Sequence, residues 1–254
     1  MQDQRKRIVI VGATSSIAEH CARTWATEPG AELTLVVRNR EKAERIAADL
    51  QVRGPRAAVR IVESGFTDPA AIRQLADTIA ADGPLDTVLI AHGSLPDQEL
   101  CQQDLAASTE ALTVNGISPV LFGEAFAGHL ANANRGTLGI IGSVAGDRGR
   151  KSNYVYGAAK GMVTRYAQGL QHRMALSGRN GVKVVLIKPG PTATPMTAHM
   201  TAQAGKMARV EDVAKCIVDG MRAGKPVVYA PGKWAVIMMV IRHLPRVVFN
   251  KMDI

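Results

Sequence analysis

The chain has 254 residues, of which 46% are apolar and 21% are charged, a composition typical of a packed globular protein rather than a disordered one. Its formal net charge of +9 favours anionic ligands or an anionic membrane surface. Only 4% of the residues are aromatic and no basic cluster is interleaved with them, so we expect no binding of nucleic acid.

The cysteines and the first residues indicate the compartment. The three cysteines are scattered and no two have the spacing of metal ligands, so we expect free thiols and no metal site. Met1–Arg7 is polar and basic, and no apolar region of about 7–15 residues with a cleavage site follows it. No apolar run reaches the roughly 18 residues of a spanning helix. We therefore expect a cytoplasmic protein.

The first strand is predicted at Arg7–Val11, and a helix follows it through Trp25. Between them lies a turn of small residues, where backbone N–H groups and the positive helix end could face a dinucleotide pyrophosphate. Only Gly12 of the usual three glycines is present, because Ser16 and Ala18 occupy the other two places. A plain strand-to-helix turn is the alternative. The candidate phosphate-binding residues are Gly12, Thr14, Ser15, Ser16 and Ile17.

Arg38-Asn39-Arg40 follows the second predicted strand, Thr34–Val37. In a dinucleotide fold this position carries an acidic residue for a ribose 2′-hydroxyl or an arginine for a 2′-phosphate. Guanidinium groups bind phosphate through paired hydrogen bonds, and no acid is present here. The pattern thus favours NADP(H) over NAD(H), and the alternative is a solvated start of a charged helix.

The remaining elements alternate between strands and helices. We expect His92, after the fourth strand, to be a hydrogen-bonded structural residue, and Gly93 to let the backbone approach a cofactor. Asp68 is a predicted helix N-cap. The predicted helices are Glu41–Val52, Asp68–Ala81, Leu100–Leu130, a helix ending near Ser177, and Val210–Ala223; the predicted strands are Ala57–Val62, Leu85–Ala91, Gly136–Ile141, Val182–Ile187 and Val227–Tyr229.

The predicted strands are continuous apolar runs, which is typical of a parallel sheet covered on both faces. There is no linker, low-complexity tract or internal repeat. We therefore predict a single α/β domain, residues 1–254, with a doubly wound parallel sheet of the Rossmann type.

Tyr156 and Lys160 lie four residues apart, so a helix places both side chains on one face. An ammonium near a phenol favours the phenolate, and we expect Lys160 to lower the pKa of Tyr156. Such a pair suits acid–base catalysis between a carbonyl and an alcohol. A chance spacing on a surface helix is the alternative interpretation.

The order of Gly12, Asn115, Ser143 and the Tyr156/Lys160 pair resembles the short-chain dehydrogenase/reductase family over almost the whole chain. The resemblance implies that Tyr156 is the general acid and that Lys160 lowers its pKa and holds the nicotinamide ribose. It implies that Ser143 hydrogen-bonds the substrate carbonyl and that Asn115 supports a water-linked proton path to Lys160. For Ser143 alone a turn serine, and for Asn115 alone a helix-kink residue, are the alternatives.

The same resemblance implies further cofactor contacts. The loop Pro189–Thr194 would close on the nicotinamide, with Thr194 near the carboxamide and phosphates. The chain departs from the family pattern at Ile90-Ala91-His92, where a pair of asparagines is usual. The implied contacts are Ala91, Gly93, Tyr156, Lys160, Pro189, Gly190, Thr192 and Thr194.

The C-terminal run Trp234–Arg246, with Asn153–Gly157 and Met196–His199, resembles the decaprenylphosphoryl-2-keto-pentose reductase branch of this family. That branch completes the epimerisation of polyprenyl-phosphate ribose to arabinose, a cell-wall precursor, and works with a flavin oxidase partner. The resemblance implies a ketone on a sugar carried by a lipid phosphate. Reduction of another keto-lipid or of a small soluble ketone is an alternative. A cofactor-sensing scaffold without activity is the non-enzyme alternative.

The segment 232–254 is also informative by itself. Its apolar run is too short to span a bilayer, and it is accompanied by Lys233, Arg242, Arg246 and Lys251. This combination predicts a segment lying in a membrane interface, attracted by anionic lipids, on the inner face of the cell membrane. An ordinary C-terminal element, or contact with another subunit of a homo-oligomer, is the alternative.

Overall fold

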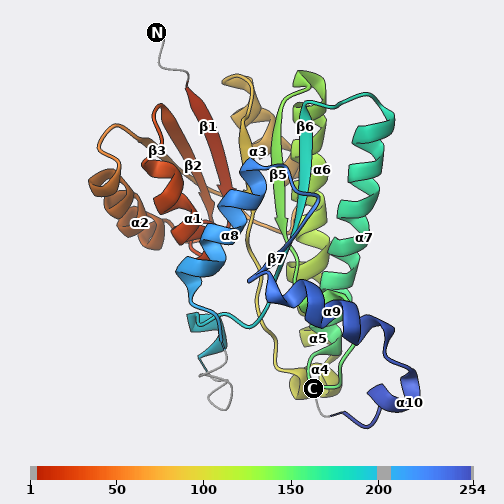
Figure 1. The fold of residues 1–254 in the computed structure, drawn as a ribbon. Helices are drawn as coiled ribbons and strands as arrows, with labels where there is room; N and C mark the ends of the chain where they lie inside the picture. The colour runs from red at the N-terminus through yellow and green to blue at the C-terminus, as the bar shows by residue number, and fades with distance from the viewer. Residues whose placement is uncertain (1–4, 199–206, 253–254) are drawn as a thin grey trace.

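A computed structural model describes residues 5–198 and 207–252 (Figure 1). Met1–Gln4, the predicted motif residue His199 and the last two residues of the tail lie outside the described residues. Seven parallel strands form one sheet in the order β3-β2-β1-β4-β5-β6-β7, which confirms the predicted doubly wound Rossmann-type fold. The strands are β1 (Lys6–Val11), β2 (Ala31–Val37), β3 (Ala58–Glu63), β4 (Thr87–Ile90), β5 (Gly136–Ile141), β6 (Val182–Pro189) and β7 (Val227–Ala230).

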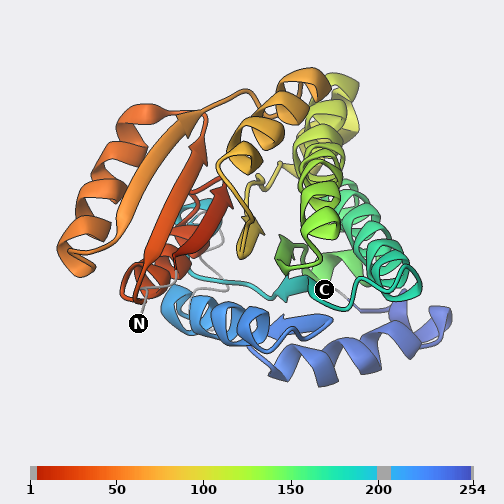
Figure 2. The ribbon, with the colours of Figure 1, turned by 90° about the horizontal axis from the view of Figure 1, so that it is seen from above.

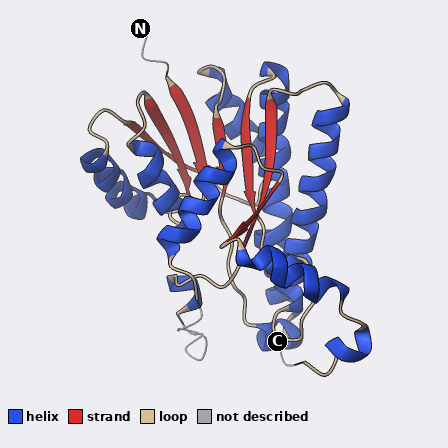
Figure 3. Cartoon of the chain, in the orientation of Figure 1, coloured by secondary structure: helices blue, strands red, loops and turns tan. Residues whose placement is uncertain are grey.

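Helices cover both faces of the sheet (Figures 2 and 3). One face packs against α1 (Ser16–Ala26), α2 (Arg40–Arg53) and α8 (Val210–Arg222) in a core that includes Trp25. The other face packs against α3 (Pro69–Ala81), α6 (Ser118–Ala133) and α7 (Tyr154–Leu176), around Phe122 and Phe126. Because both faces are buried, the strands are apolar at nearly every position instead of alternating.

The long helical region predicted at Leu100–Leu130 is divided in the structure. It comprises α4 (Gln98–Gln103), α5 (Leu105–Leu112), a π-helical turn (Thr113–Ile117) and α6. Asp104 separates α4 from α5, because its carboxylate accepts the Ala106 N–H at 2.7 Å and starts a new helix. The predicted N-cap Asp68 is confirmed, since its carboxylate accepts the Ala70 N–H at 3.1 Å.

The C-terminal segment forms α9 (Lys233–His243), which lies near the ends of the strands, and α10 (Arg246–Phe249), which lies farther from the sheet (Figure 1). The guanidinium of Arg148 donates to the carbonyls of Ile241, at 2.5 Å, and Leu244, at 2.7 Å. It also lies 3.8 Å from the centroid of the Phe249 ring. Arg148 therefore holds the tail against the loop that follows β5.

A buried ion pair stabilises the same loop. The Asp147 carboxylate pairs with the Lys188 ammonium, and the two side chains are 2% and 4% exposed. The Tyr229 hydroxyl donates to Asp147 at 2.7 Å. One carboxylate thus connects the loop after β5 with β6 and β7.

Replacing Asp147 with Asn should lower the free energy of unfolding by about 3–5 kcal/mol, because it leaves the buried Lys188 ammonium without a countercharge. The double variant Asp147→Leu/Lys188→Met removes both charges and should cost less than the single variant. Urea unfolding at neutral pH measures both effects.

The exposed pair of Lys215 and Asp219 provides the control. Lys215→Met should leave the unfolding free energy nearly unchanged, because both charges of this pair are exposed to water. If Asp147→Asn changed it equally little, the buried pair would not stabilise the loop as inferred.

Candidate active site

A cleft opens at the carboxyl edge of the sheet, where β1 and β4 are neighbours and their connections leave in opposite directions. Gly12 ends β1 with φ +78°, a conformation that favours glycine. A methyl group on Gly12 would lie 2.6 Å from the Cβ of His92. Glycine is therefore required at this position both for its backbone and for the contact between the two loops.

Asn115 lies in the π-helical turn and is completely buried. Its Oδ1 accepts the Ser94 N–H at 2.9 Å, and its Nδ2 donates to the Ala111 carbonyl at 3.0 Å. A Cβ on Gly93 would lie 2.9 Å from the Asn115 amide oxygen and 3.5 Å from the Lys160 Nζ. The π-helical turn thus interrupts the regular helix between α5 and α6, and it brings Asn115 beside Gly93 and Lys160.

Helix α7 brings Tyr156 and Lys160 to the cleft, and the end of β5 brings Ser143. The Lys160 Nζ donates to the Ile141 carbonyl at 3.1 Å and lies 5.7 Å from the centroid of the Tyr156 ring. The Ser143 hydroxyl accepts the Ala145 N–H at 3.1 Å and hydrogen-bonds with the Tyr156 phenol. All four predicted catalytic residues line one cleft.

Burial determines the protonation of this group. It raises the pKa of the Tyr156 phenol, which the hydrogen bond with Ser143 partly opposes, so the expected lowering by Lys160 is not observed. Burial also lowers the pKa of Lys160 to about 8, since the ammonium is removed from water. At neutral pH the site therefore holds a protonated Tyr156 phenol, which is a proton donor, beside a Lys160 amine that is largely protonated.

His92 is a structural residue, as predicted. Its Nε2 hydrogen-bonds the Ser118 hydroxyl at 2.8 Å, and its ring contacts those of Phe66 and Phe122 edge-on. Burial, with the charges of Lys160 and Arg38, lowers the pKa of His92 to about 3. The neutral imidazole does not exchange protons near neutral pH, so we assign it no acid–base role.

The cleft continues from the catalytic residues to the N-terminus of α1 and to Arg38. Its two parts share the lining residues Ser15, Ile17, His92, Gly93, Thr194 and Met196. Gly12 and Gly93 line the cleft with backbone, and their missing side chains leave room for His92 and Asn115. Within the described residues, the lining contains no Asp or Glu. These features fit a phosphorylated dinucleotide.

Arg38 lines the far end of the cleft and lies 5.7 Å from the centroid of the Phe66 ring. Asn39 and Arg40 do not line it. The Asn39 side chain caps α2 by accepting the Lys42 N–H at 2.9 Å, and the Arg40 guanidinium pairs with Glu44 at 3.1 Å. The second cation that lines this end is Lys42. The sequence alone did not single it out, because it is one of several charged residues at the start of α2.

The other predicted cofactor contacts all line the cleft: Gly12, Thr14, Ser15, Ser16, Ile17, Ala91, Gly93, Pro189, Gly190, Thr192 and Thr194. The Thr194 hydroxyl and the Thr197 side chain cap a short 3-10 turn, Pro195–Thr197. The Trp234 side chain of α9 packs against the backbone of Gly190, because a Cβ on Gly190 would lie 1.9 Å from the indole Nε1. Sequence reasoning missed Ser94, Arg150 and Asn153, which also line the cleft.

The family model of short chain dehydrogenases matches residues 6–205. An uncharacterised oxidoreductase of Mycobacterium tuberculosis is 34% identical over 246 residues, which cover 96% of this chain and 96% of the relative. An uncharacterised oxidoreductase of Streptomyces coelicolor is 29% identical over 251 residues, covering 97% and 96% of the two chains.

Solved structures have the same fold. A short-chain dehydrogenase from Sphingobium yanoikuyae in complex with NADPH has a TM-score of 0.81 and 21% identity, with coverage of 97% of this chain and 96% of that chain. A short chain dehydrogenase from Burkholderia cenocepacia in complex with NADP has a TM-score of 0.80 and 19% identity, with coverage of 99% and 98%. The family match covers β1 to β6, the residues that line the cleft and all four predicted catalytic residues, so the chain belongs to the short-chain dehydrogenase/reductase family and is an NAD(P)-dependent oxidoreductase.

Proposed function

We propose that the protein uses NADPH to reduce the keto group of a 2-keto-pentose carried on a polyprenyl phosphate. The observation that carries the reductase part is the continuous cleft, which connects the Tyr156 group with the cations Arg38 and Lys42. A soluble ketone or another keto-lipid would use the same catalytic residues and is tested below.

The nicotinamide cofactor, when bound, supplies the hydride that forms the new C–H bond. Ser143 and Tyr156 hydrogen-bond the carbonyl oxygen, and Tyr156 donates the proton that forms the new O–H bond. Burial keeps the phenol protonated, which suits reduction. Lys160 stabilises the phenolate that remains, and Asn115 supports its reprotonation through water.

The preference for NADPH rests on charge. Arg38 and Lys42 line the end of the cleft distant from Tyr156, where a 2′-phosphate would accept their N–H groups. The relatives from Sphingobium yanoikuyae and Burkholderia cenocepacia bind NADPH and NADP, respectively. NAD(H) lacks the phosphate and would leave both cations without a partner in the cleft.

The lipid part of the proposal is supported by α9. Met238 faces the protein and is 1% exposed, whereas Val236, Met239 and Val240 form a second apolar face that is exposed. No helix among the described residues is long and apolar enough to cross a bilayer. The sequence from 233 to 252 has no Asp or Glu and contains Lys233, Arg242, Arg246 and Lys251, so the segment is basic, which favours anionic lipid.

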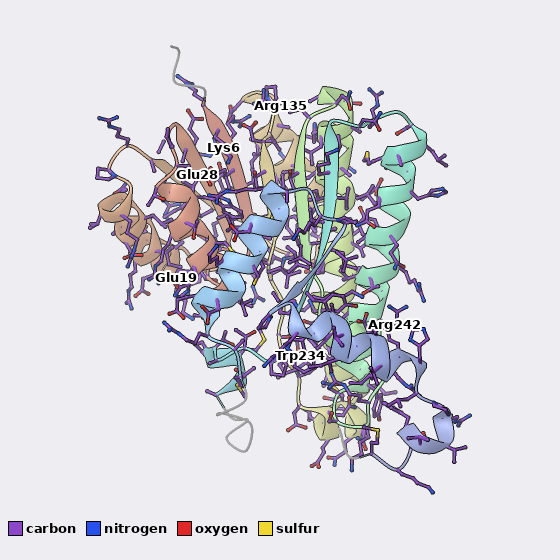
Figure 4. All side chains as sticks on the ribbon, in the orientation of Figure 1. Lys6, Glu19, Glu28, Arg135, Trp234 and Arg242 are labelled. Atoms are coloured by element: carbon purple, nitrogen blue, oxygen red, sulfur yellow. The ribbon has the colours of Figure 1, made fainter. Side chains whose placement is uncertain are left out.

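The bilayer is therefore the partner that this face fits best, with α9 and α10 lying in the interface of the inner membrane leaflet. Trp234 contacts the Gly190 loop, and Figure 4 shows Trp234 and Arg242 at opposite ends of α9. A substrate held by its lipid at this surface would present its head group beside the cleft. We propose a flavin oxidase, which would generate the keto group, as the partner enzyme.

The protein should oxidise NADPH with a polyprenyl-phosphate 2-keto-pentose faster than with neutral short-chain ketones or keto-acyl substrates. In the Tyr156→Phe variant, turnover should fall by roughly 10²–10⁴, the contribution of a positioned acid, while NADPH still binds. NADPH absorbance measures turnover and NADPH fluorescence measures binding. Near-normal turnover of Tyr156→Phe would contradict the catalytic assignment. Equal rates with soluble ketones would contradict the lipid-linked substrate, and no turnover with any ketone would favour a scaffold.

Arg38→Gln/Lys42→Gln should weaken NADPH binding by on the order of 1.5–3 kcal/mol, the range for hydrogen bonds to charged groups, and change NADH binding little. Fluorescence titrations with both cofactors measure this difference. Arg40→Gln is the matched control, because Arg40 pairs with Glu44 and should affect neither cofactor. Equal losses for NADPH and NADH would show that the two cleft cations do not contact a 2′-phosphate.

The protein should co-sediment with vesicles of phosphatidylglycerol and phosphatidylcholine at low salt, and less as salt screens the charges. Replacing Lys233, Arg246 and Lys251 with Gln should remove most of the salt dependence, since each basic residue contributes about 1 kcal/mol near the surface. Replacing Val236, Met239 and Val240 with Ser should reduce binding at every salt concentration. Trp234 and Ile241 are unsuitable for this test because they share the inward face of Met238.

A protein that stays in the supernatant at low salt would not have an autonomous membrane anchor. If the same protein eluted as an oligomer that the three serine substitutions dissociate, the exposed face of α9 would belong to a contact with a second copy.

A further inference from the structure

Three polar side-chain atoms near the start of α7 are buried and have no hydrogen-bond partner within the described residues: Gln98 Nε2, Arg150 Nε and Asn153 Oδ1. Arg150 and Asn153 line the cleft that also contains Ser143 and Tyr156. Buried polar atoms are nearly always hydrogen-bonded, and those left without partners in a cleft indicate what the cleft binds.

Arg150 is the more informative of the two. Among the described residues, no carboxylate pairs with its guanidinium and no hydrogen bond from it is formed. Burial lowers the pKa of Arg150, because the guanidinium is partly removed from water with no anion beside it. A partly buried cation without a countercharge is unfavourable, and an anionic group of a ligand would offset that cost.

Asn153 indicates a second contact. It is the N-cap of α7, a position where Asn usually accepts an N–H of the first helical turn, yet its side chain makes no capping bond. Instead, Gln98 accepts the Val155 N–H at 3.0 Å, which leaves Asn153 Oδ1 available. The start of the 23-residue helix α7 adds its partial positive charge near this point.

The position of Arg150 separates it from the cofactor phosphates. Arg38 and Lys42 line the opposite end of the cleft, and the turn after β1 lines the part between the two ends. Arg150 lines only the part that contains the four catalytic residues.

We propose that Arg150 determines substrate specificity by binding a phosphate or carboxylate carried by the ketone substrate, while Asn153 Oδ1 accepts a hydroxyl of the same molecule. This assignment deepens the proposed reductase function and rests on it. It restricts the substrates to anionic ketones that also carry a hydroxyl group near the carbonyl.

Ketone binding to the complex of the protein with NADP⁺ tests this proposal, because the oxidised cofactor cannot reduce the ketone and the result does not depend on turnover. Calorimetry would compare dihydroxyacetone phosphate with dihydroxyacetone, and acetoacetate with methyl acetoacetate. The phosphate pair and the carboxylate pair distinguish the two kinds of anion. In the wild-type protein at least one anionic probe should bind more tightly than its neutral partner.

Arg150→Gln should weaken binding of that anionic probe by about tenfold to a hundredfold and change binding of the neutral partner by less than about twofold. Arg150→Lys keeps the charge and should have an intermediate effect. Arg179→Gln, which removes an exposed positive charge, should leave all four dissociation constants unchanged.

Asn153→Ala should weaken binding of dihydroxyacetone and its phosphate, and leave methyl acetoacetate, which has no hydroxyl, unaffected. The proposal is overturned if neither anionic probe binds more tightly than its neutral partner, or if Arg150→Gln weakens charged and neutral probes equally. A parallel loss of NADP⁺ affinity would assign Arg150 to the cofactor and would also overturn it. Failure of the reductase function itself would appear separately, as absent turnover with intact binding of the anionic probes.

Discussion

The contact between Gly12 and His92 is the constraint on which the site depends. It joins the ends of β1 and β4, the two neighbouring strands from which the chain departs in opposite directions. A side chain at position 12 would separate them, because its Cβ would lie within 2.8 Å of three His92 atoms. Since His92 is fixed by Ser118 and by two phenylalanine rings, the floor of the cleft is rigid before any ligand enters.

In the cleft, burial rather than charge pairing determines the pKa values of the catalytic side chains. Tyr156 and Lys160 are both shifted toward their neutral forms because water is excluded from them. The described part of the cleft lining contains no carboxylate to offset Lys160, Arg150 or Arg38. A site with this balance favours anions at both ends. Under our proposals a cofactor phosphate would occupy one end and an anionic group of the substrate the other.

The sequence predicted most of the fold because the apolar strands and helical periods are strong local signals. It predicted that Asn115, Ser143, Tyr156 and Lys160 belong to one site, and all four line one cleft, because the spacing within α7 and the order of Ser143 and Asn115 are properties of the chain itself. It did not predict the direction of the Tyr156 pKa shift, because burial of the phenol depends on residues distant in sequence. Nor could it show that Lys42 rather than Arg40 lines the cleft, since both lie at the charged start of a helix. In the structure Arg40 pairs with Glu44 and Lys42 lines the cleft. Arg150 lies in a polar stretch without a motif, so the sequence did not predict that it lines the cleft.

The hydrogen bonds from Arg148 attach the C-terminal segment to the loop after β5. That loop begins at Ser143, and its Asp147 is fixed to Lys188. Displacement of α9 would break the two hydrogen bonds to this loop and remove the Trp234 indole from Gly190. A fusion or truncation at this end of the chain would therefore disturb contacts that reach the candidate site, and not only the surface of the molecule.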